Sequence, residues 1–176
     1  MTMPTIRQLA PDDADIYHAL RLRMLREHPE AFGSSFEEEL SKPLAWVQAR
    51  LAPATGAPQK FVLGAFAAGN DLIGSVGLAV EERIKERHKG SVFGMFVAPE
   101  AGATGVGRAL LSECIARARR VAGLELLTLS VTSSNLRALQ FYKAAGFRAF
   151  GIEERAIKVA GKYYPKAHMV LDLHAA

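Results

Sequence analysis

One stretch of the sequence constrains the fold more than any other, because it joins an apolar strand to an amphipathic helix through a glycine-rich turn. The apolar run Gly90–Val97 is typical of a central strand that is buried on both faces. Glycines occupy three of the six positions of Gly102–Gly107, and Arg108–Ala122 repeats apolar side chains at helical spacing. Such a turn presents consecutive backbone N–H groups at the positive end of a helix, which is how pyrophosphate groups are bound.

Two well-known phosphate-binding loops do not account for this turn. A P-loop has Lys followed by Ser or Thr after its last glycine, whereas Arg108 and Ala109 follow Gly107 here. A dinucleotide-binding fingerprint has the spacing G-x-G-x-x-G, and Gly102–Gly107 has the reverse, G-x-x-G-x-G. Taken alone, the turn is equally compatible with an ordinary tight connection between a strand and a helix.

The rest of the chain alternates strand and helix patterns. Residues Phe61–Val80 approach membrane-spanning length, but Asn70 and Asp71 at their centre favour a hairpin of two buried strands. A strand–helix–strand unit over Ser91–Val131 predicts an α/β fold with a mixed central sheet of about seven strands and about four helices. The other expected strands are Thr5–Leu9, Leu124–Thr132, Phe147–Arg155 and Ala167–Leu173. Three further helices are expected. The first starts at Pro11 and turns Ile16, Leu20 and Met24 inward. The second starts at Pro43, turns Leu44, Val47 and Leu51 inward and is ended by Pro53, Gly56 and Pro58, and the third starts at Asn135 and is closed by Gly146.

Length and composition set broad limits. A chain of 176 residues suits one domain that buries roughly 70% of its unfolded surface, so we expect a single domain over residues 1–176. The 22 Lys and Arg exceed the 18 Asp and Glu by only four, which fits an anionic small ligand or a nucleic acid and decides neither. The single cysteine, Cys114, excludes an intramolecular disulfide and fits a reducing, cytoplasmic compartment. Neither a signal peptide nor a metal site is expected.

A second constellation lies downstream of the glycine-rich turn. Asn135, Leu139 and Tyr142 are spaced to share one face of a helix that follows the strand ending near Thr132. Asn135 at the helix start can cap it, and Tyr142 two turns later presents a hydroxyl along the same side. Taken alone, these residues are better explained as a helix cap and a core aromatic than as functional groups.

Together the two segments resemble the GCN5-related N-acetyltransferase (GNAT) family, over most of the chain from about Phe61 onward. The resemblance implies splayed central parallel strands that form a cleft for acetyl-CoA, the cosubstrate. It implies that a bulged strand contacts the pantetheine arm and acetyl group through Met95, Phe96 and Val97. The positions that match the pyrophosphate-binding loop are Gly102, Ala103, Thr104, Gly105, Val106, Gly107 and Arg108. Asn135 matches a residue that contacts the cofactor arm, and Gly102 stands where the family commonly has Gln or Arg, although the backbone amides remain.

The resemblance also implies how acetyl transfer would occur. The chain is expected to be an acyltransferase that transfers groups other than aminoacyl groups, moving acetyl from the thioester to a primary amine by direct attack in a ternary complex. Tyr142 matches the usual general acid, and the backbone of Met95 and Phe96 would contact the thioester oxygen. The base is poorly located by sequence, since Glu81, Glu82 and His88 all follow or precede central strands; Glu82 is our candidate. Cys114 lies on an apolar helix face, which favours a buried, inert thiol.

The acceptor is the least constrained part of the prediction. By resemblance, the loops Phe32–Leu40 and Ala160–Lys166 flank its site, with Phe32, Phe36 and Tyr164 against an apolar stem and Glu37–Glu39 attracting its charge. A small-molecule amine and a peptide amine both stay open, and a homodimer is possible. We expect no membrane or nucleic-acid partner, because only the charge excess favours the latter. The alternative from another class is an acyl-CoA-binding module without turnover.

Overall fold

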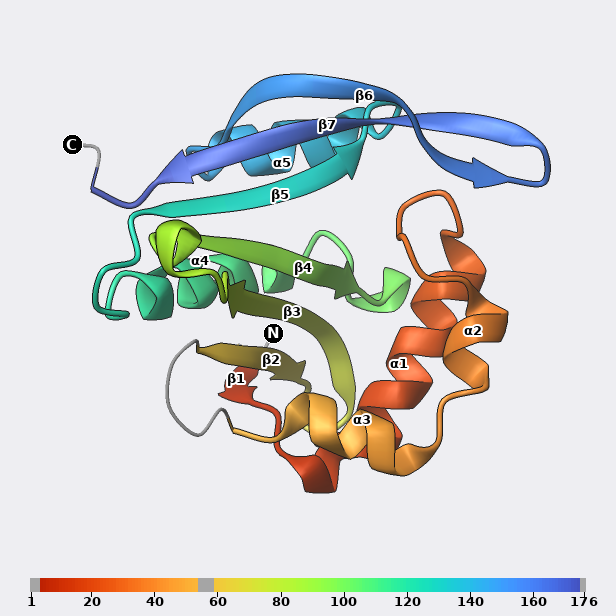
Figure 1. Ribbon diagram of the computed structural model, residues 1–176. Coiled ribbons are helices and arrows are strands. Elements are labelled where there is room, and N and C mark those ends of the chain that lie inside the picture. The colour runs from red at the N-terminus through yellow and green to blue at the C-terminus, as the bar shows by residue number, and fades with distance from the viewer. Residues whose placement is uncertain (1–3, 54–58, 175–176) are drawn as a thin grey trace.

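The computed structural model describes residues 4–53 and 59–174, which form one mixed sheet with helices on both faces (Figure 1). Within these residues the sheet has seven strands in the order β1-β2-β3-β4-β5-β7-β6. The strands are β1 (Thr5–Gln8), β2 (Lys60–Phe66), β3 (Leu72–Val80), β4 (Lys89–Val97), β5 (Leu126–Thr132), β6 (Arg148–Val159) and β7 (Lys162–Asp172). The helices are α1 (Ala14–Glu27), α2 (Phe36–Leu40), α3 (Leu44–Leu51), α4 (Val106–Ala118) and α5 (Leu136–Ala144). The predicted α/β fold with a mixed sheet is confirmed.

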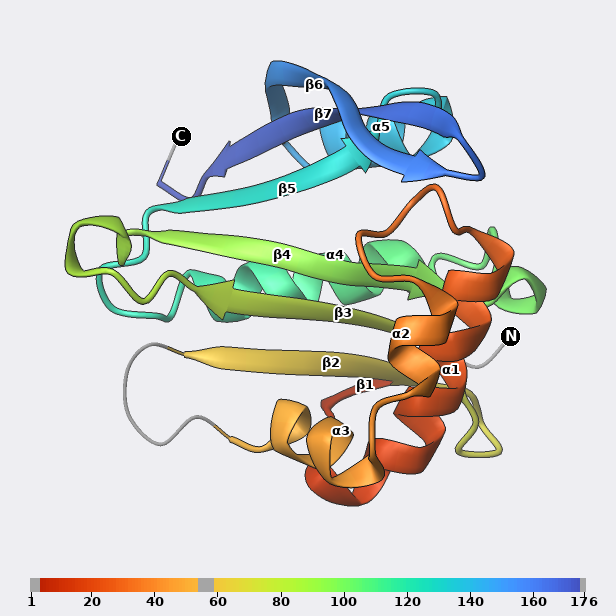
Figure 2. The same cartoon turned by 45° about the vertical axis from the view of Figure 1, so that its right-hand side comes forward.

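The two faces of the sheet are covered by different parts of the chain. Helices α1, α2 and α3 lie on one face, and α4 and α5 lie on the other (Figures 1 and 2). Helix α4 packs Leu110, Leu111 and Cys114 against the central strands in the largest apolar cluster. Burial raises the pKa of the Cys114 thiol to about 12, so this cysteine is the inert packing residue that its position predicted.

The central strands β4 and β5 are parallel for only a short distance. Their pairing covers Lys89–Ser91 against Leu126–Thr128, and the other neighbouring strands of the sheet are antiparallel. Beyond Ser91 the two strands diverge toward their carboxyl ends, as Figure 2 shows. The predicted splayed pair is therefore present, and helix α4 connects the two strands as the strand–helix–strand pattern predicted.

The hairpin predicted over Phe61–Val80 is confirmed as β2 and β3. Asn70 takes a positive φ of 64° in the turn, and its backbone N–H donates to the Ala67 carbonyl at 2.9 Å. Both strands pair in antiparallel register and are buried along most of their length. Of the helices in the described ranges, none has the length and apolar character needed to cross a membrane.

Two predicted loops were wrong. The stretch Phe32–Leu40 contains helix α2, which adds a fifth helix to the four expected. Its start is fixed by a capping box, since the Ser35 hydroxyl accepts from the Glu38 N–H at 3.1 Å and the Glu38 carboxylate accepts from the Ser35 N–H at 2.8 Å. The stretch Ala160–Lys166 is mostly strand β7, because Ala160 and Gly161 both have positive φ and close a two-residue hairpin turn.

Smaller errors concern helix faces and ends. Ile16 is 41% exposed, because α1 turns Tyr17, Leu20 and Met24 toward the sheet instead. Leu44 is 39% exposed at the start of α3, while Val47 and Leu51 are buried. Helix α4 starts at Val106 and ends at Ala118, both earlier than the predicted bounds, and Gly146 closes α5 with a φ of 96° as expected. Gly56 and Pro58, predicted to help end α3, lie outside the described residues.

Candidate functional site

A cavity of about 1120 Å³ lies where β4 and β5 diverge. Its walls come from residues 92–97 of β4, 101–108 of the following turn and helix, and 129–132 of β5. Asn135 and Tyr142 of α5 join the same wall, and residues 31–34 between α1 and α2 lie on the other side. The structure thus brings both sequence constellations, more than twenty residues apart in the chain, to one cavity.

The β4 wall contains a β-bulge. Phe93 pairs with Gly77 and Phe96 pairs with Ser75, so Gly94 and Met95 together oppose the single residue between those partners. Gly94 has a φ of 59°, and its carbonyl accepts the Ser75 hydroxyl at 3.2 Å. A bulge leaves backbone groups out of the strand ladder. Main-chain groups of the bulge are therefore available to a ligand in the cavity.

The predicted strand residues line the cavity in different ways. Met95 and Val97 pack against the large apolar cluster on the α4 side, whereas the Phe96 side chain packs with the α1 residues Leu20 and Met24. Because the Phe96 ring is buried in that cluster, its contribution to the cavity comes mainly from the backbone. The contact with the acetyl group that the resemblance implies for this strand stays a prediction.

The glycine-rich turn ends in a helix start with unpaired donors. The first helical hydrogen bond of α4 runs from the Ala109 N–H to the Gly105 carbonyl at 3.0 Å. The N–H groups of Val106, Gly107 and Arg108 precede it and have no helical acceptor, and they lie at the positive end of the helix. These three residues also line the cavity. The arrangement is suited to an anion of the pyrophosphate type.

Two glycines are required by this turn. Gly105 caps α4 with a φ of 86°, and a Cβ atom on Gly102 would lie 2.9 Å from the Pro99 carbonyl oxygen. The Thr104 hydroxyl donates to the Ala101 carbonyl at 2.6 Å and so fixes the turn internally. On the protein surface before the turn, the Arg23 guanidinium of α1 donates hydrogen bonds to both carboxylate oxygens of Glu100, at 2.6 and 2.7 Å.

Helix α5 and its cap residue supply two polar groups of the cavity lining. The Asn135 Oδ1 accepts from the Ala138 N–H at 3.0 Å, so the predicted cap is present and the side-chain NH₂ is left as a donor. Tyr142 is 9% exposed, and burial raises the pKa of its hydroxyl. The hydroxyl consequently keeps its proton at neutral pH, and it has no hydrogen-bond partner among the described residues.

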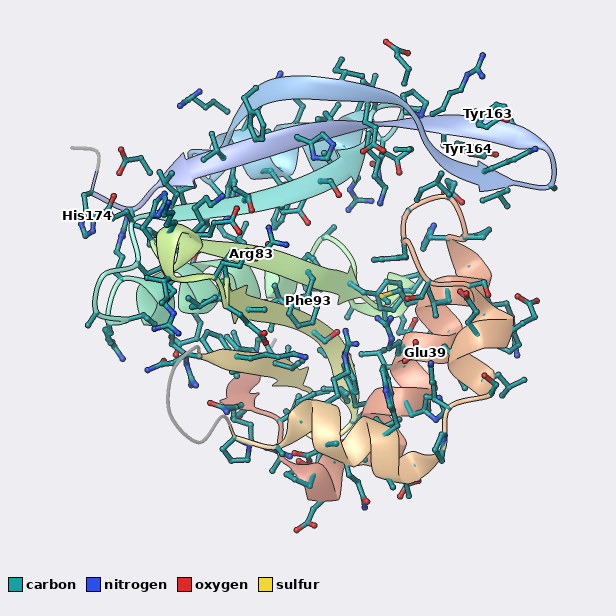
Figure 3. The ribbon with its side chains drawn as sticks, viewed as in Figure 1. Glu39, Arg83, Phe93, Tyr163, Tyr164 and His174 are labelled. Carbon is teal, nitrogen blue, oxygen red and sulfur yellow. The ribbon has the colours of Figure 1, made fainter. Side chains whose placement is uncertain are left out.

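The predicted acceptor residues are only partly brought to the cavity. Phe32 lines it, but Phe36 lies under the Arg26 guanidinium, whose Cζ atom is 4.5 Å from the ring centroid. Tyr164 lies in β7 near the tip of the β6–β7 hairpin and does not reach the cavity wall (Figure 3). Glu82, the candidate base, lines a separate depression of about 360 Å³ beyond the end of β3.

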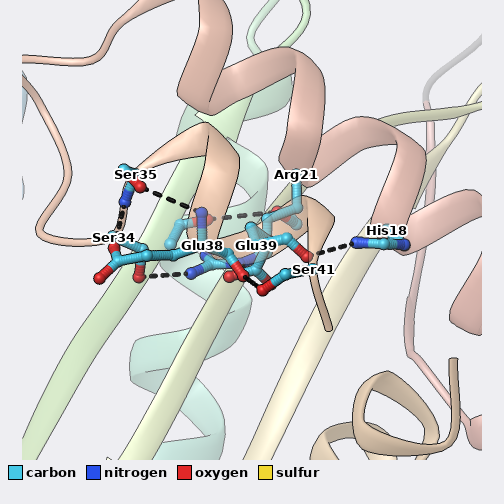
Figure 4. Close-up of polar contacts among 9 residues, drawn as sticks. His18, Arg21, Ser34, Ser35, Glu38, Glu39 and Ser41 are labelled. Carbon is cyan, nitrogen blue, oxygen red and sulfur yellow. Dashed lines mark hydrogen bonds and ion pairs between the residues drawn. The ribbon is translucent and has the colours of Figure 1, made fainter. Parts of the chain in front are cut away.

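Two residues of the acidic run Glu37–Glu39, which was predicted to attract the charge of the amine, have structural roles. Glu38 belongs to the capping box of α2. Glu39 is buried and pairs with Arg21, whose Nε atom lies 2.6 Å from Glu39 Oε1, with 8% and 3% of the two side chains exposed (Figure 4). Arg21 also donates to the Ser34 hydroxyl at 3.1 Å, which ties α1 to α2 beside the cavity.

Several lining residues carry no sequence signal that pointed to them. They are Arg21 and His28 of the α1 region, Arg50 of α3, Phe93 of β4, Arg137 of α5 and Lys166 of β7. One of them, His28, lies beside a predicted site residue, since its ring centroid is 6.2 Å from that of Phe96. Among the described residues, no group of three His, Cys, Asp or Glu side chains is arranged to hold a metal ion.

Comparison with known proteins gives a consistent result. A family model described as the acetyltransferase (GNAT) domain matches residues 6–169. An acetyltransferase of the GNAT family from Streptococcus pneumoniae is 24% identical, with 96% of this chain and 99% of that one covered and a TM-score of 0.81. No curated protein matches the sequence significantly.

Two further similar structures carry names that specify an acceptor. A spermidine N-acetyltransferase chimera from Vibrio cholerae and hSSAT is 19% identical, with 98% and 96% of the two chains covered and a TM-score of 0.74. The ribosomal-protein-S18-alanine N-acetyltransferase from Escherichia coli is 19% identical, with 99% and 96% covered and a TM-score of 0.72. At these identities the likeness concerns the fold.

Proposed function

The chain belongs to the GNAT acetyltransferase family, and from this membership and the cavity we propose that it is an N-acetyltransferase acting on a primary amine. Acetyl-CoA is the cosubstrate of this family. The observation that supports the proposal most strongly is that the β4 bulge, the unpaired amides of α4 and the Tyr142 hydroxyl share one cavity. We also propose that residues 1–176 form one catalytic domain.

The residues of this chain fit the cosubstrate. The free N–H groups of Val106, Gly107 and Arg108 would hold its pyrophosphate, and the Arg108 side chain adds a positive charge. Gly102 stands where the family commonly carries Gln or Arg and contributes no side chain, but the amides of Val106, Gly107 and Arg108 do not depend on a side chain at that position. Along the cavity, the bulge at Gly94 and Met95 and the Asn135 amide would bind the pantetheine arm.

Each step of the transfer is assigned to a group of this chain. When bound, acetyl-CoA supplies an acetyl group activated as a thioester. Backbone groups of Met95 and Phe96 would stabilise the negative charge that develops on the acyl oxygen as the amine attacks directly in a ternary complex. The Tyr142 hydroxyl, held protonated by its burial, would give its proton to the departing sulfur.

The base that takes the proton from the amine is assigned to His28. Glu82 lies outside the cavity, and no Asp or Glu lines it among the described residues. The His28 ring lies next to Phe96, whose backbone is proposed to contact the thioester. Imidazole is the side chain that most often accepts protons near neutral pH. In His28→Asn, kcat is expected to fall about tenfold or more, and to recover partly at high pH where the amine deprotonates by itself.

Release of free thiol from acetyl-CoA in the presence of a panel of amines tests the proposed function. The panel would contain small amines, amino acids and a short peptide with a free N-terminus, since either a small-molecule or a peptide acceptor is consistent with the family. Amine-dependent release supports an acetyltransferase. Saturable acetyl-CoA binding without release with any amine would instead support the acyl-CoA-binding module.

A further inference from the structure

The part of the cavity away from the glycine-rich turn is positively charged. We call it the acceptor side and define it by its lining residues Arg21, His28, Phe32, Arg50, Phe93 and Lys166. It carries three side chains with permanent or near-permanent positive charge, and no carboxylate lines the cavity in the parts of the chain that are described. A site for a polycationic amine would have the opposite charge.

The three cations are not equivalent, because only Arg21 is neutralised at close range. Arg21 is paired with Glu39 at 2.6 Å and is held by Ser34. The Arg50 Nε atom is buried and has no hydrogen-bond partner in the described ranges 4–53 and 59–174. The rest of the Arg50 side chain is partly exposed, and it forms no ion pair in those ranges, whereas Arg21 has the Glu39 carboxylate at 2.6 Å. Arg50 is therefore the group on this wall with the most to gain from an anionic ligand.

Aromatic rings hold the Arg50 guanidinium in place. Its Cζ atom lies 5.1 Å from the Phe93 ring centroid and 5.6 Å from that of Trp46. A Cβ atom on Gly77 would lie only 2.3 Å from the Phe93 ring, so the ring lies directly over the bare backbone of β3. Figure 3 shows Phe93 on the sheet face that α1–α3 cover. Phe93 immediately precedes the bulge residue Gly94, and Arg50, Phe93 and Gly94 all line the cavity.

Two lysines lie near this region: Lys166 lines the acceptor side, and Lys60 lines the separate depression that Glu82 also lines. The Lys60 Nζ atom lies 6.0 Å from the Phe93 ring, and burial together with the charge of Arg50 lowers the pKa of this lysine, against the opposing effect of Glu82. Burial also lowers the pKa of Lys166, whose charge is favoured by Glu153 across the strand pair. Positive charge at this end of the cavity is thus only partly compensated by the protein itself.

We propose that the acceptor amine also carries a carboxylate, as an amino acid does, and that Arg50 binds this carboxylate while the amine faces the β4 bulge. The inference rests on the proposed acetyl transfer and specifies its substrate class. A planar guanidinium can bind both carboxylate oxygens at once, and stacking on Phe93 and Trp46 orients it for this. A polyamine such as spermidine would meet like charges from Arg50 and Lys166.

Matched pairs of acceptors test this inference. The rate of thiol release from acetyl-CoA is measured with a set of L-amino acids, with the carboxamide of each, and with spermidine. The amine of a carboxamide is more often neutral near pH 8, so chemical reactivity alone favours the carboxamides. We expect kcat/KM to be roughly tenfold to hundredfold higher for at least one amino acid than for its carboxamide and for spermidine.

Variants of Arg50 show whether this preference comes from the proposed contact. In Arg50→Gln, kcat/KM for the preferred amino acid is expected to fall roughly tenfold to hundredfold, mainly through KM, while the carboxamide changes less than about threefold. Arg50→Lys keeps the positive charge but lacks the planar guanidinium, so its kcat/KM for the preferred amino acid should lie between those of wild type and Arg50→Gln. Arg83→Gln, at an exposed site after β3 (Figure 3), is the matched control and should behave like wild type.

The possible results separate the inference from the proposed function. If spermidine or the carboxamides are the better acceptors, or if Arg50→Gln lowers both members of a pair equally, the carboxylate inference is wrong and the acetyltransferase stands. If no amine gives thiol release, the thermal shift caused by amino acid and carboxamide with CoA decides. Stabilisation by the amino acid alone, lost in Arg50→Gln, supports the inference, and equal or no stabilisation refutes it.

Discussion

The two sides of the cavity are built from different kinds of chemical group. On the cofactor side, the proposed contacts come mainly from the backbone, through the bulge at Gly94 and Met95 and the free amides at the start of α4. On the acceptor side they come from side chains of four separate segments, among them Arg21, Arg50 and Lys166. The cofactor side is therefore expected to tolerate side-chain changes that leave the turn intact, whereas the acceptor side depends on single charges.

The chemical difference has a consequence for specificity. Backbone amides bind a pyrophosphate whatever the side chains beside them, so a chain can keep the cofactor side while its acceptor side changes. The similar structures named for spermidine and for an alanine of a ribosomal protein share the fold of this chain at 19% identity. Charged side chains such as Arg50 are the natural place for such acceptors to be distinguished.

The largest expected effect tests the one side chain to which the cofactor side assigns chemistry. In Tyr142→Phe, kcat at saturating acetyl-CoA should fall about 10²- to 10⁴-fold, because the departing sulfur loses its proton donor. The KM for acetyl-CoA should change little, since the ring remains in place between Phe141 and Phe147. Unchanged turnover would remove the assigned role of Tyr142.

The next effect tests the buried ion pair on the acceptor side. Glu39→Gln leaves the buried Arg21 charge without a counter-ion, so the free energy of unfolding should fall by about 3–5 kcal/mol in urea denaturation. The KM for the amine should rise while that for acetyl-CoA stays near wild type. The double variant Arg21→Met, Glu39→Leu removes both charges and should recover most of the stability. A single variant as stable as wild type would show that the pair does not hold α2.

A smaller effect tests whether the backbone of the turn is what binds. Gly105→Ala places a Cβ atom in open space but at a φ of 86°, which costs about 1–2 kcal/mol and favours a different turn. We expect the KM for acetyl-CoA to rise about tenfold. Gly161→Ala carries the same strain at a φ of 82° in the β6–β7 hairpin and is the matched control. Equal effects of the two variants on this KM would contradict the assignment of the turn.

The smallest effect concerns the ion pair that joins α1 to the turn. Hydrogen bonds from Arg23 lower the pKa of Glu100 from its ordinary value of 4.5 to about 2. Because the folded-state pKa is the lower one, the pair stabilises the fold above about pH 4.5, and this contribution is lost as the pH falls toward 2. The difference in Tm between wild type and Glu100→Gln should be small at pH 6, since both groups are exposed, and should vanish near pH 2. A difference in Tm between the two proteins that grows as the pH falls would contradict a stabilising role of the Arg23–Glu100 pair.

The sequence predicted the strand, turn and helices of the cofactor side well because their information is local. A strand, a turn with glycines and a helix follow one another without interruption over Gly90–Ala118, and the cap at Asn135 has a short-range signal of the same kind. The hairpin of β2 and β3 was also predictable, since Asn70 marks its turn. Here the local pattern and the tertiary structure agree.

The acceptor side was predicted poorly because it is assembled from distant residues. Nothing around Arg50 or Lys166 in the chain indicates that α3 and β7 bring them to one cavity. Local signals were also missed: Ser35 and Glu38 have the spacing of a capping box, which marks the start of α2, and Ala160-Gly161 is a two-residue turn that leaves Tyr164 in a strand. Within the acidic run, Glu38 and Glu39 have the partners Ser35 and Arg21, which the sequence prediction assigned no role.

Amide protection on CoA binding is the most direct test of whether the cofactor side binds through its backbone. Amide hydrogen exchange would be measured for residues 94–97 and 103–108, with and without CoA, in wild type and in Arg50→Gln. We expect CoA to slow exchange in both segments, because the cofactor side binds through its backbone. The slowing should be equal in wild type and in Arg50→Gln. Protection absent from residues 103–108, or lost on changing Arg50, would contradict this expectation.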